Sequence, residues 1–192
     1  MLALLALAVA LPDPAVDETE RVWLFEPAVE IGVLVHLDDA VDEGLLVRSS
    51  LDVRWKRLRS AFFRLSYDTS TARMLRENVE GVSRLEADLG LQDITLGGGW
   101  RLGPDALQVV GSIQLGIQLA DLPVLRQGPN QSFTVEAETS VAGISLVALG
   151  LEYYIFPDLA LTTEFTGRLR FVELDGRSPV AFGFTLGVTT AI

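Results

Sequence analysis

The chain shows a two-residue alternation of apolar and polar positions, and the alternation is clearest over residues 159–192. From Leu159 to Phe171 most odd positions are apolar, while the even positions carry alanine, threonine, glutamate and arginine. The alternation restarts at Val180, after the Asp-Gly of ELDGRSP. Successive side chains of a strand point to opposite faces, and an Asp-Gly turn often joins antiparallel strands. The pattern therefore predicts a β-hairpin with one apolar and one polar face.

The same alternation recurs along the rest of the chain and predicts about eight strands. In the fourth strand the apolar phase shifts near Asp93, which indicates a β-bulge. Residues 69–83 instead carry apolar side chains at a spacing of three to four, and this predicts a long loop with two helical turns. The predicted strands cover residues 22–37, 45–57, 61–69, 84–100, 107–119, 133–154, 159–173 and 178–192.

Short and longer connections alternate between these predicted strands. This alternation is typical of an up-and-down antiparallel barrel with tight turns at one end. No strand–helix–strand rhythm is present, which argues against a parallel α/β fold. We therefore expect an all-β protein in which residues 16–192 form a single closed barrel of about eight strands.

The aromatic residues indicate which face of the barrel points outward. A soluble, lipocalin-like barrel would place its apolar face inside, whereas a membrane barrel turns this face to lipid. The aromatic residues share the apolar parity and lie near strand ends, where amphipathic rings would meet the lipid headgroups. The alternating stretches also have about the ~9–11 residues that a tilted strand needs to span a membrane. The predicted interface aromatics are Trp23, Trp55, Trp100 and Tyr153 at the short-turn end and Tyr67, Phe133, Phe171 and Phe182 at the other.

The opposite face of the strands carries charges of both signs and would line the lumen. Buried charges are costly unless they are paired, and an eight-stranded barrel has an interior that side chains just fill. We therefore expect a charge network that plugs the lumen and leaves no open diffusion pore. Its predicted members are Glu26, Glu30, Arg48, Asp52, Arg54, Arg64, Glu136, Glu138, Glu164, Arg168 and Arg170.

Composition and the N-terminal segment narrow the class of protein further. A net charge of −11 argues against an electrostatic nucleic-acid binder, and the absence of cysteine excludes disulfides and thiolate metal sites. The apolar run from Leu2 to Leu11 is shorter than the ~20 residues of a transmembrane helix. With Ala8-Val9-Ala10 as a cleavage signal, it predicts a signal peptide and spacer over residues 1–15.

The stretch LGLEYYIFPDLALTTEFTGRLRF, with the C-terminal strand, resembles the small eight-stranded outer-membrane barrels of Gram-negative bacteria, the OmpA/OmpX-type. The resemblance covers residues 21–192. It implies a monomer in the bacterial outer membrane, with outer-membrane lipid, lipopolysaccharide and the barrel-assembly machinery as partners. Such barrels usually end in an aromatic residue, whereas this chain ends in Ile192.

Candidate catalytic chemistry is limited to one group of polar residues. His36 is the single histidine of the sequence, and with Ser66 and Asp68 it could form a site at the outer rim, as in lipid-modifying barrel enzymes. No local motif of those enzymes is present, so a rim-located hydrolase or acyltransferase stays an alternative, as does a soluble lipocalin-like carrier of an apolar ligand. The glycines of LGGGW lack the lysine of a phosphate loop, and Asp38, Asp39, Asp42 and Glu43 lack the spacing of a calcium loop.

The favoured hypothesis is a non-enzymatic outer-membrane barrel. It would serve envelope integrity, adhesion or partner binding through the loops at 38–44, 70–83, 121–132 and 173–179. We expect no cofactor and no metal ion.

Overall fold

The computed structural model describes residues 22–37, 41–55, 58, 60–79, 82–127, 133–172 and 178–192, with the backbone alone at 75–79, 82–86, 123–127 and 133–137. Within these ranges no helix has the length and apolar character needed to cross a membrane. The described residues form eight strands: β1 (Trp23–His36), β2 (Gly44–Trp55), β3 (Ala61–Val79), β4 (Val82–Leu102), β5 (Leu107–Gln127), β6 (Phe133–Phe156), β7 (Leu159–Arg170) and β8 (Val180–Thr190).

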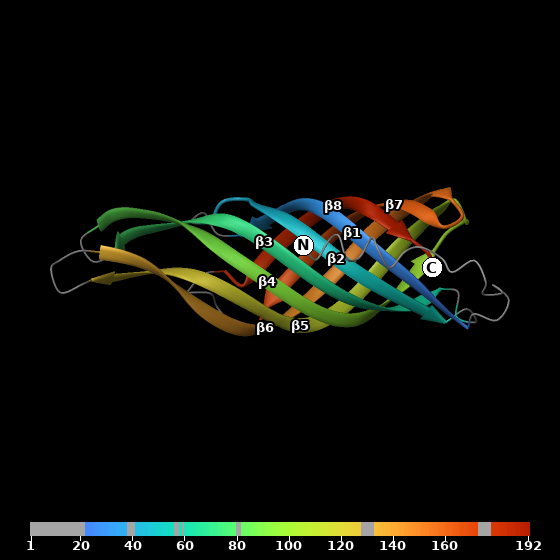
Figure 1. The fold of residues 1–192 in the computed structure, drawn as a ribbon, viewed down its shortest axis with the longest axis horizontal. Coiled ribbons are helices and arrows are strands. Elements are labelled where there is room, and N and C mark those ends of the chain that lie inside the picture. Colours follow the sequence, from blue (N-terminus) through green and yellow to red (C-terminus); the bar gives the residue numbers. More distant parts are fainter. Residues whose placement is uncertain are drawn as a thin grey trace.

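The strands form one closed antiparallel barrel in which each strand pairs with the next and β8 pairs with β1 (Figure 1). The predicted up-and-down barrel is thereby confirmed. One row of paired residues starts at Glu26 of β1, crosses all the other strands and returns to β1 at His36, ten residues further along. Such a stagger requires strongly tilted strands, so residues of one row lie at different depths.

The apolar face of every strand points outward. On β4 and β5, Leu96 and Leu115 are 62% and 60% exposed, whereas the side chains of Thr95 and Gln114 beside them are buried. A sheet that spans lipid must close because lipid offers no partner to unpaired backbone groups. The orientation is the reverse of a lipocalin and contradicts the hypothesis of a soluble carrier with an apolar interior.

The two ends of the barrel differ in the length of their strands. At the short-turn end β4 turns into β5 through residues 103–106, where Gly103 has a φ of 138°, and β6 turns into β7 at residues 157–158. At the opposite end β3, β4, β5 and β6 continue past their neighbours (Figure 1). We name the segments 75–79 with 82–86 and 122–127 with 133–138 the projecting hairpins. β4 and β5 pair only as far as Gly90 and Asp121, so the two hairpins separate beyond this point.

The first projecting hairpin corrects the prediction for residues 69–83. The chain continues as β3 to Val79 and returns as β4 from Val82, with no helical turns. Thr71 and Arg73 are exposed while Ala72 and Met74 are buried, so the period is two and not three to four. The apparent helical spacing arose because few apolar residues occupy this segment, and strand pairing decided the backbone conformation.

Two further predictions were wrong on β4 and β5. The predicted loop at 121–132 is partly strand, since β5 continues to Gln127 and Pro123 pairs with Ala137. The predicted bulge near Asp93 is absent from the register of β4 with both of its neighbours. Leu89 and Leu91 point inward with Asp93. The shift of apolar phase reflects a change in what fills the barrel, not an extra residue.

Candidate functional site

The interior of the barrel contains two layers of different chemistry. The charged layer occupies the middle and the short-turn half, and the apolar layer fills the end that carries the projecting hairpins. The charged layer consists of Glu26, Glu30, Arg48, Asp52, Arg54, Arg64, Asp68, Asp93, Arg101, Glu152, Glu164 and Arg168. The apolar layer consists of Leu34, Val41, Leu46, Ala72, Met74, Leu89, Leu91, Ala120 and Ala181.

Arg48 of β2 lies at the centre of the charged layer and has no exposed surface. Its Nε and Nη2 donate to the two carboxylate oxygens of Asp68 at 2.8 and 2.9 Å, and its Nη1 donates to Glu164. Glu30 is the third carboxylate near Arg48, at 3.8 Å from the same Nη1. The two parallel bonds to Asp68 have the fork geometry that makes arginine–carboxylate pairs strong.

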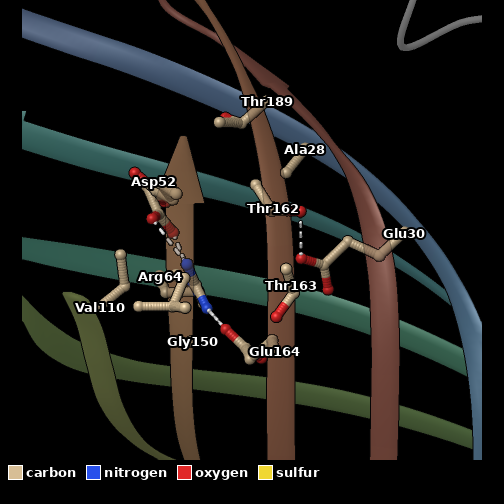
Figure 2. A pocket seen from close by; sticks show the side chains of 12 residues that line it. Ala28, Glu30, Asp52, Arg64, Val110, Gly150, Thr162, Thr163, Glu164 and Thr189 are labelled. Carbon is tan, nitrogen blue, oxygen red and sulfur yellow. Dashed lines mark hydrogen bonds and ion pairs between the residues drawn. The ribbon is translucent and has the colours of Figure 1, made fainter. Parts of the chain in front are cut away.

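Arg64 of β3 repeats this arrangement nearer the short-turn end. It donates to the two oxygens of Asp52 at 2.7 and 2.9 Å and to Glu164 through Nη1. Figure 2 shows Arg64 between these two carboxylates, beside a cavity of about 10 Å³. Glu164 therefore joins Arg48 and Arg64 into one continuous network.

Arg101 of β4 anchors the network at the short-turn end. It donates to Glu26, to Asp52 at 2.9 Å and to Glu152 at 3.1 Å. Arg54 lies on β2, which pairs with β1, and donates to the second oxygen of Glu26 at 2.6 Å. These contacts link four strands around the lumen.

Phe62 lies inside the barrel between two of these arginines. The guanidinium carbons of Arg64 and Arg101 lie 5.1 and 4.9 Å from its ring centroid, within the range of cation–π interactions. A Cβ at Gly99 would lie 2.3 Å from the ring. Gly99 of the LGGGW stretch therefore makes room for this ring.

At the edge of the charged layer that faces the apolar layer lie Arg168, Asp93 and their partners. Arg168 donates to Asp68 at 2.6 Å and to Asp93 at 2.5 Å, and Gln118 donates to the other oxygen of Asp93 at 2.8 Å. Glu30 accepts hydrogen bonds from Thr162 of β7 and Thr185 of β8 at 2.8 and 2.9 Å. Each described carboxylate at this edge thus has a donor.

Most of the predicted lumen charges lie in this network. Arg170 is buried, but it donates to the Ser140 hydroxyl and not to a described carboxylate. Glu138 is exposed, and the side chain of Glu136 is not described. Parity also assigns Asp68, Arg101 and Glu152 to the polar face, but they were not among the predicted members of the network, although the structure places them in it. Asp93 was not assigned to this face because of the wrong bulge.

The predicted interface aromatics lie on the outer surface, as far as they are described. At the short-turn end Trp23 stacks on Trp55 with ring centroids 6.2 Å apart, and Trp100 and Tyr153 are exposed nearby. Towards the other end Phe171 is exposed and Phe182 stacks on Phe165 at 5.8 Å. Tyr67 is exposed within β3, which continues to Val79 and so leaves this residue away from the strand end. The side chain of Phe133 lies outside the description. Their contact with lipid headgroups stays a prediction.

The structure does not bring His36, Ser66 and Asp68 into one group. Both oxygens of Asp68 are bonded to arginines, and the Ser66 hydroxyl donates to Gln114 at 3.0 Å. His36 lies six residues along β1 from Glu30, which shares a register row with Asp68.

The observed geometry defines a class of protein. It is a small transmembrane β-barrel of eight strands with a filled interior and an apolar outer surface, of the bacterial outer-membrane type. No protein-family model matches the sequence, and no curated protein matches it.

Solved structures share the fold at low sequence identity. The chain is similar to Neisserial surface protein A, with a TM-score of 0.58 and 13% identity over 88% of this chain and 97% of that one. It is also similar to Ail, the attachment invasion locus protein of Yersinia pestis, with a TM-score of 0.50 and 14% identity over the same shares. These similarities establish the outer-membrane barrel fold, and the predicted OmpA/OmpX-type architecture is confirmed.

Proposed function

We propose that this barrel anchors the two projecting hairpins at the bacterial surface, where they attach the cell to an external partner. The observation that carries the proposal is the length of the central strands. β3 to β6 have 19 to 24 residues, whereas β1, β2, β7 and β8 have 11 to 14. In outer-membrane barrels the short turns face the periplasm and the longer segments face the outside.

The filled interior supports a binding role over transport. The cavities beside Arg64 and beside Arg170 measure about 10 and 30 Å³, enough for about one and two water molecules. The apolar layer lies between the charged layer and the hairpins. A rigid plugged cylinder suits an anchor, because it fixes the base of both hairpins.

The outer edges of the hairpins offer backbone groups to a partner. β7 pairs with β6 only up to Ile144, and β2 pairs with β3 only up to Thr71, followed by a bridge from Val41 to Met74. Beyond these points the described parts of β3 and β6 lack a neighbouring strand on one side. Exposed strand edges of this kind can bind a further strand or a polar surface.

Shortening both hairpins tests this function. We expect a variant with Asn-Gly in place of residues 76–85 and again in place of 123–137 to fold but to lose most attachment of expressing cells to host-cell monolayers. Two further variants, each with only one hairpin shortened, are the matched controls. Their attachment shows which hairpin binds. Heat-modifiable gel mobility would confirm folding, and undiminished attachment of the folded double variant would contradict the proposal.

We further propose that the protein is not an enzyme, since Ser66 and Asp68 are hydrogen-bonded to Gln114 and to two arginines and not to His36. Replacing His36 by alanine is expected to leave the acylation pattern of envelope lipids unchanged. Mass spectrometry of lipid extracts from cells with the wild type, the variant and no barrel would check this. An acyl change that depends on the barrel and disappears in His36→Ala would establish the enzymatic alternative.

A further inference from the structure

Arg170, the last residue of β7, is a buried arginine to which no carboxylate of the described residues is bonded. Its relative exposure is 6%, and its Nη2 donates to the Ser140 hydroxyl at 3.0 Å. Its Nε and Nη1 are buried and have no hydrogen-bond partner. In contrast, Arg48, Arg64 and Arg101 each bind two or more carboxylates. An unneutralised guanidinium is costly to bury, so this site is incomplete as it stands.

A cavity of about 30 Å³ lies beside Arg170 at the end of the barrel opposite the short turns. It has room for about two water molecules, which matches the two oxygens that an oxyanion presents to a guanidinium. Its polar wall is formed by Arg170, Arg168, His36, Gln118 and Ser178, and apolar residues such as Ile144 close the other side. The wall is therefore rich in hydrogen-bond donors.

The charges around the cavity leave Arg170 as its unbalanced cation. Arg168 is bonded to Asp68 and Asp93. The two oxygens of Asp93 already accept from Arg168 and Gln118. No described acidic group is left to neutralise the Arg170 guanidinium.

We propose that this cavity binds a small oxyanion group, with the free Nε and Nη1 donors of Arg170 as its principal contacts. Phosphate, sulfate and carboxylate groups all present the paired oxygens that a guanidinium binds. The volume admits the paired oxygens of one such group and not a whole sugar or nucleotide. The ligand is therefore a free anion or the terminal group of a larger molecule.

The test follows the arginine side chains directly by NMR. The full barrel is refolded in dodecylmaltoside micelles, and inorganic phosphate or sulfate is titrated against chloride at constant ionic strength. We expect a saturable shift of the Arg170 Nε–H signal with phosphate or sulfate and no saturable shift with chloride. Arg170→Gln and Arg170→Lys lack this signal, so their binding is followed by the Arg168 Nε–H signal, because Arg168 lines the same cavity. Loss of charge-assisted bonds in Arg170→Gln should weaken binding by about tenfold or more.

The matched control is Arg73→Gln, because Arg73 is exposed on β3 and lies outside the cavity. It should bind as the wild type does. Arg170→Lys keeps the charge without the planar fork and should bind with intermediate affinity, which provides a second comparison should Arg170→Gln fail to fold. A signal that shifts only linearly, or equal affinity of the wild type and the folded Arg170 variants, would overturn the proposal.

A second arm separates a lipid phosphate from a free anion. The barrel is placed in phosphatidylcholine bilayers with or without phosphatidic acid, and the same signal is recorded before and after phosphate is added. A shift caused by phosphatidic acid alone assigns the oxyanion to a membrane lipid, and a shift that requires added phosphate assigns it to the aqueous phase. Absence of both shifts refutes the site.

Discussion

Replacing Arg48 by methionine is expected to lower the free energy of unfolding by about 3–5 kcal/mol, the range for breaking a buried ion pair from one side. Methionine approximates the length of the arginine stem but removes every donor. Asp68 and Glu164 would lose their bonds to Nε, Nη1 and Nη2. Both carboxylates would then be buried with fewer donors, since Asp68 keeps Arg168 and Glu164 keeps Arg64.

Urea unfolding of the barrel in phospholipid vesicles would measure this loss. The control is Arg73→Met, which makes the same change at an exposed position of β3 and should alter stability by about 0.5 kcal/mol or less. Equal stability of Arg48→Met and Arg73→Met would show that the charged layer contributes nothing that a well-packed apolar side chain cannot replace.

Replacing Leu115 by arginine is expected to destabilise the barrel by about 2–4 kcal/mol, the cost of this side chain on the lipid face at the bilayer midplane. Leu115 is 60% exposed and lies in the middle of β5, opposite Leu96 and Ser145. The charged head would have to reach a headgroup region from the centre of the hydrocarbon.

Leu102→Arg is the matched comparison, because Leu102 is 57% exposed but ends β4 at the short-turn end. There the expected cost falls to about 0–1 kcal/mol. Vesicle-based unfolding of both variants gives the difference. Equal costs at the two positions would contradict the assignment of Leu115 to the middle of the membrane-spanning band.

The barrel itself could be predicted from the sequence because lipid on one side and a polar lumen on the other impose a strict period of two. This held for β1, β2, β7 and β8, whose predicted bounds fall within a few residues of the observed ones. It failed at residues 69–83 and near Asp93. There the chain leaves the charged layer, the interior becomes apolar at Leu89 and Leu91, and parity alone no longer separates inside from outside.

The presence of charged side chains in the lumen could be predicted from the sequence, but not which of them form ion pairs. Parity placed Arg48 and Glu164 on one face, but 116 residues separate them in the sequence, and only closure of the barrel brings them into contact. Phe62 was not identified. Its ring fits between Arg64 and Arg101 only because Gly99, on the next strand, leaves space for it, and the sequence does not reveal this neighbour. Parity assigned Arg170 to the lumen, but which described carboxylates it would or would not reach depends on the positions of all its neighbours.

The connection between β1 and the last two strands bears on the order of assembly. Glu30 of β1 accepts hydrogen bonds from Thr162 of β7 and Thr185 of β8, and the backbones of Phe25 and Ile192 exchange hydrogen bonds nearer the short-turn end. Glu30 therefore obtains these donors only when the first and last strands meet. In a half-inserted sheet that carboxylate would have only its ionic contact with Arg48 of β2, so insertion and closure should occur as one cooperative event, with the seam between β1 and β8 forming late.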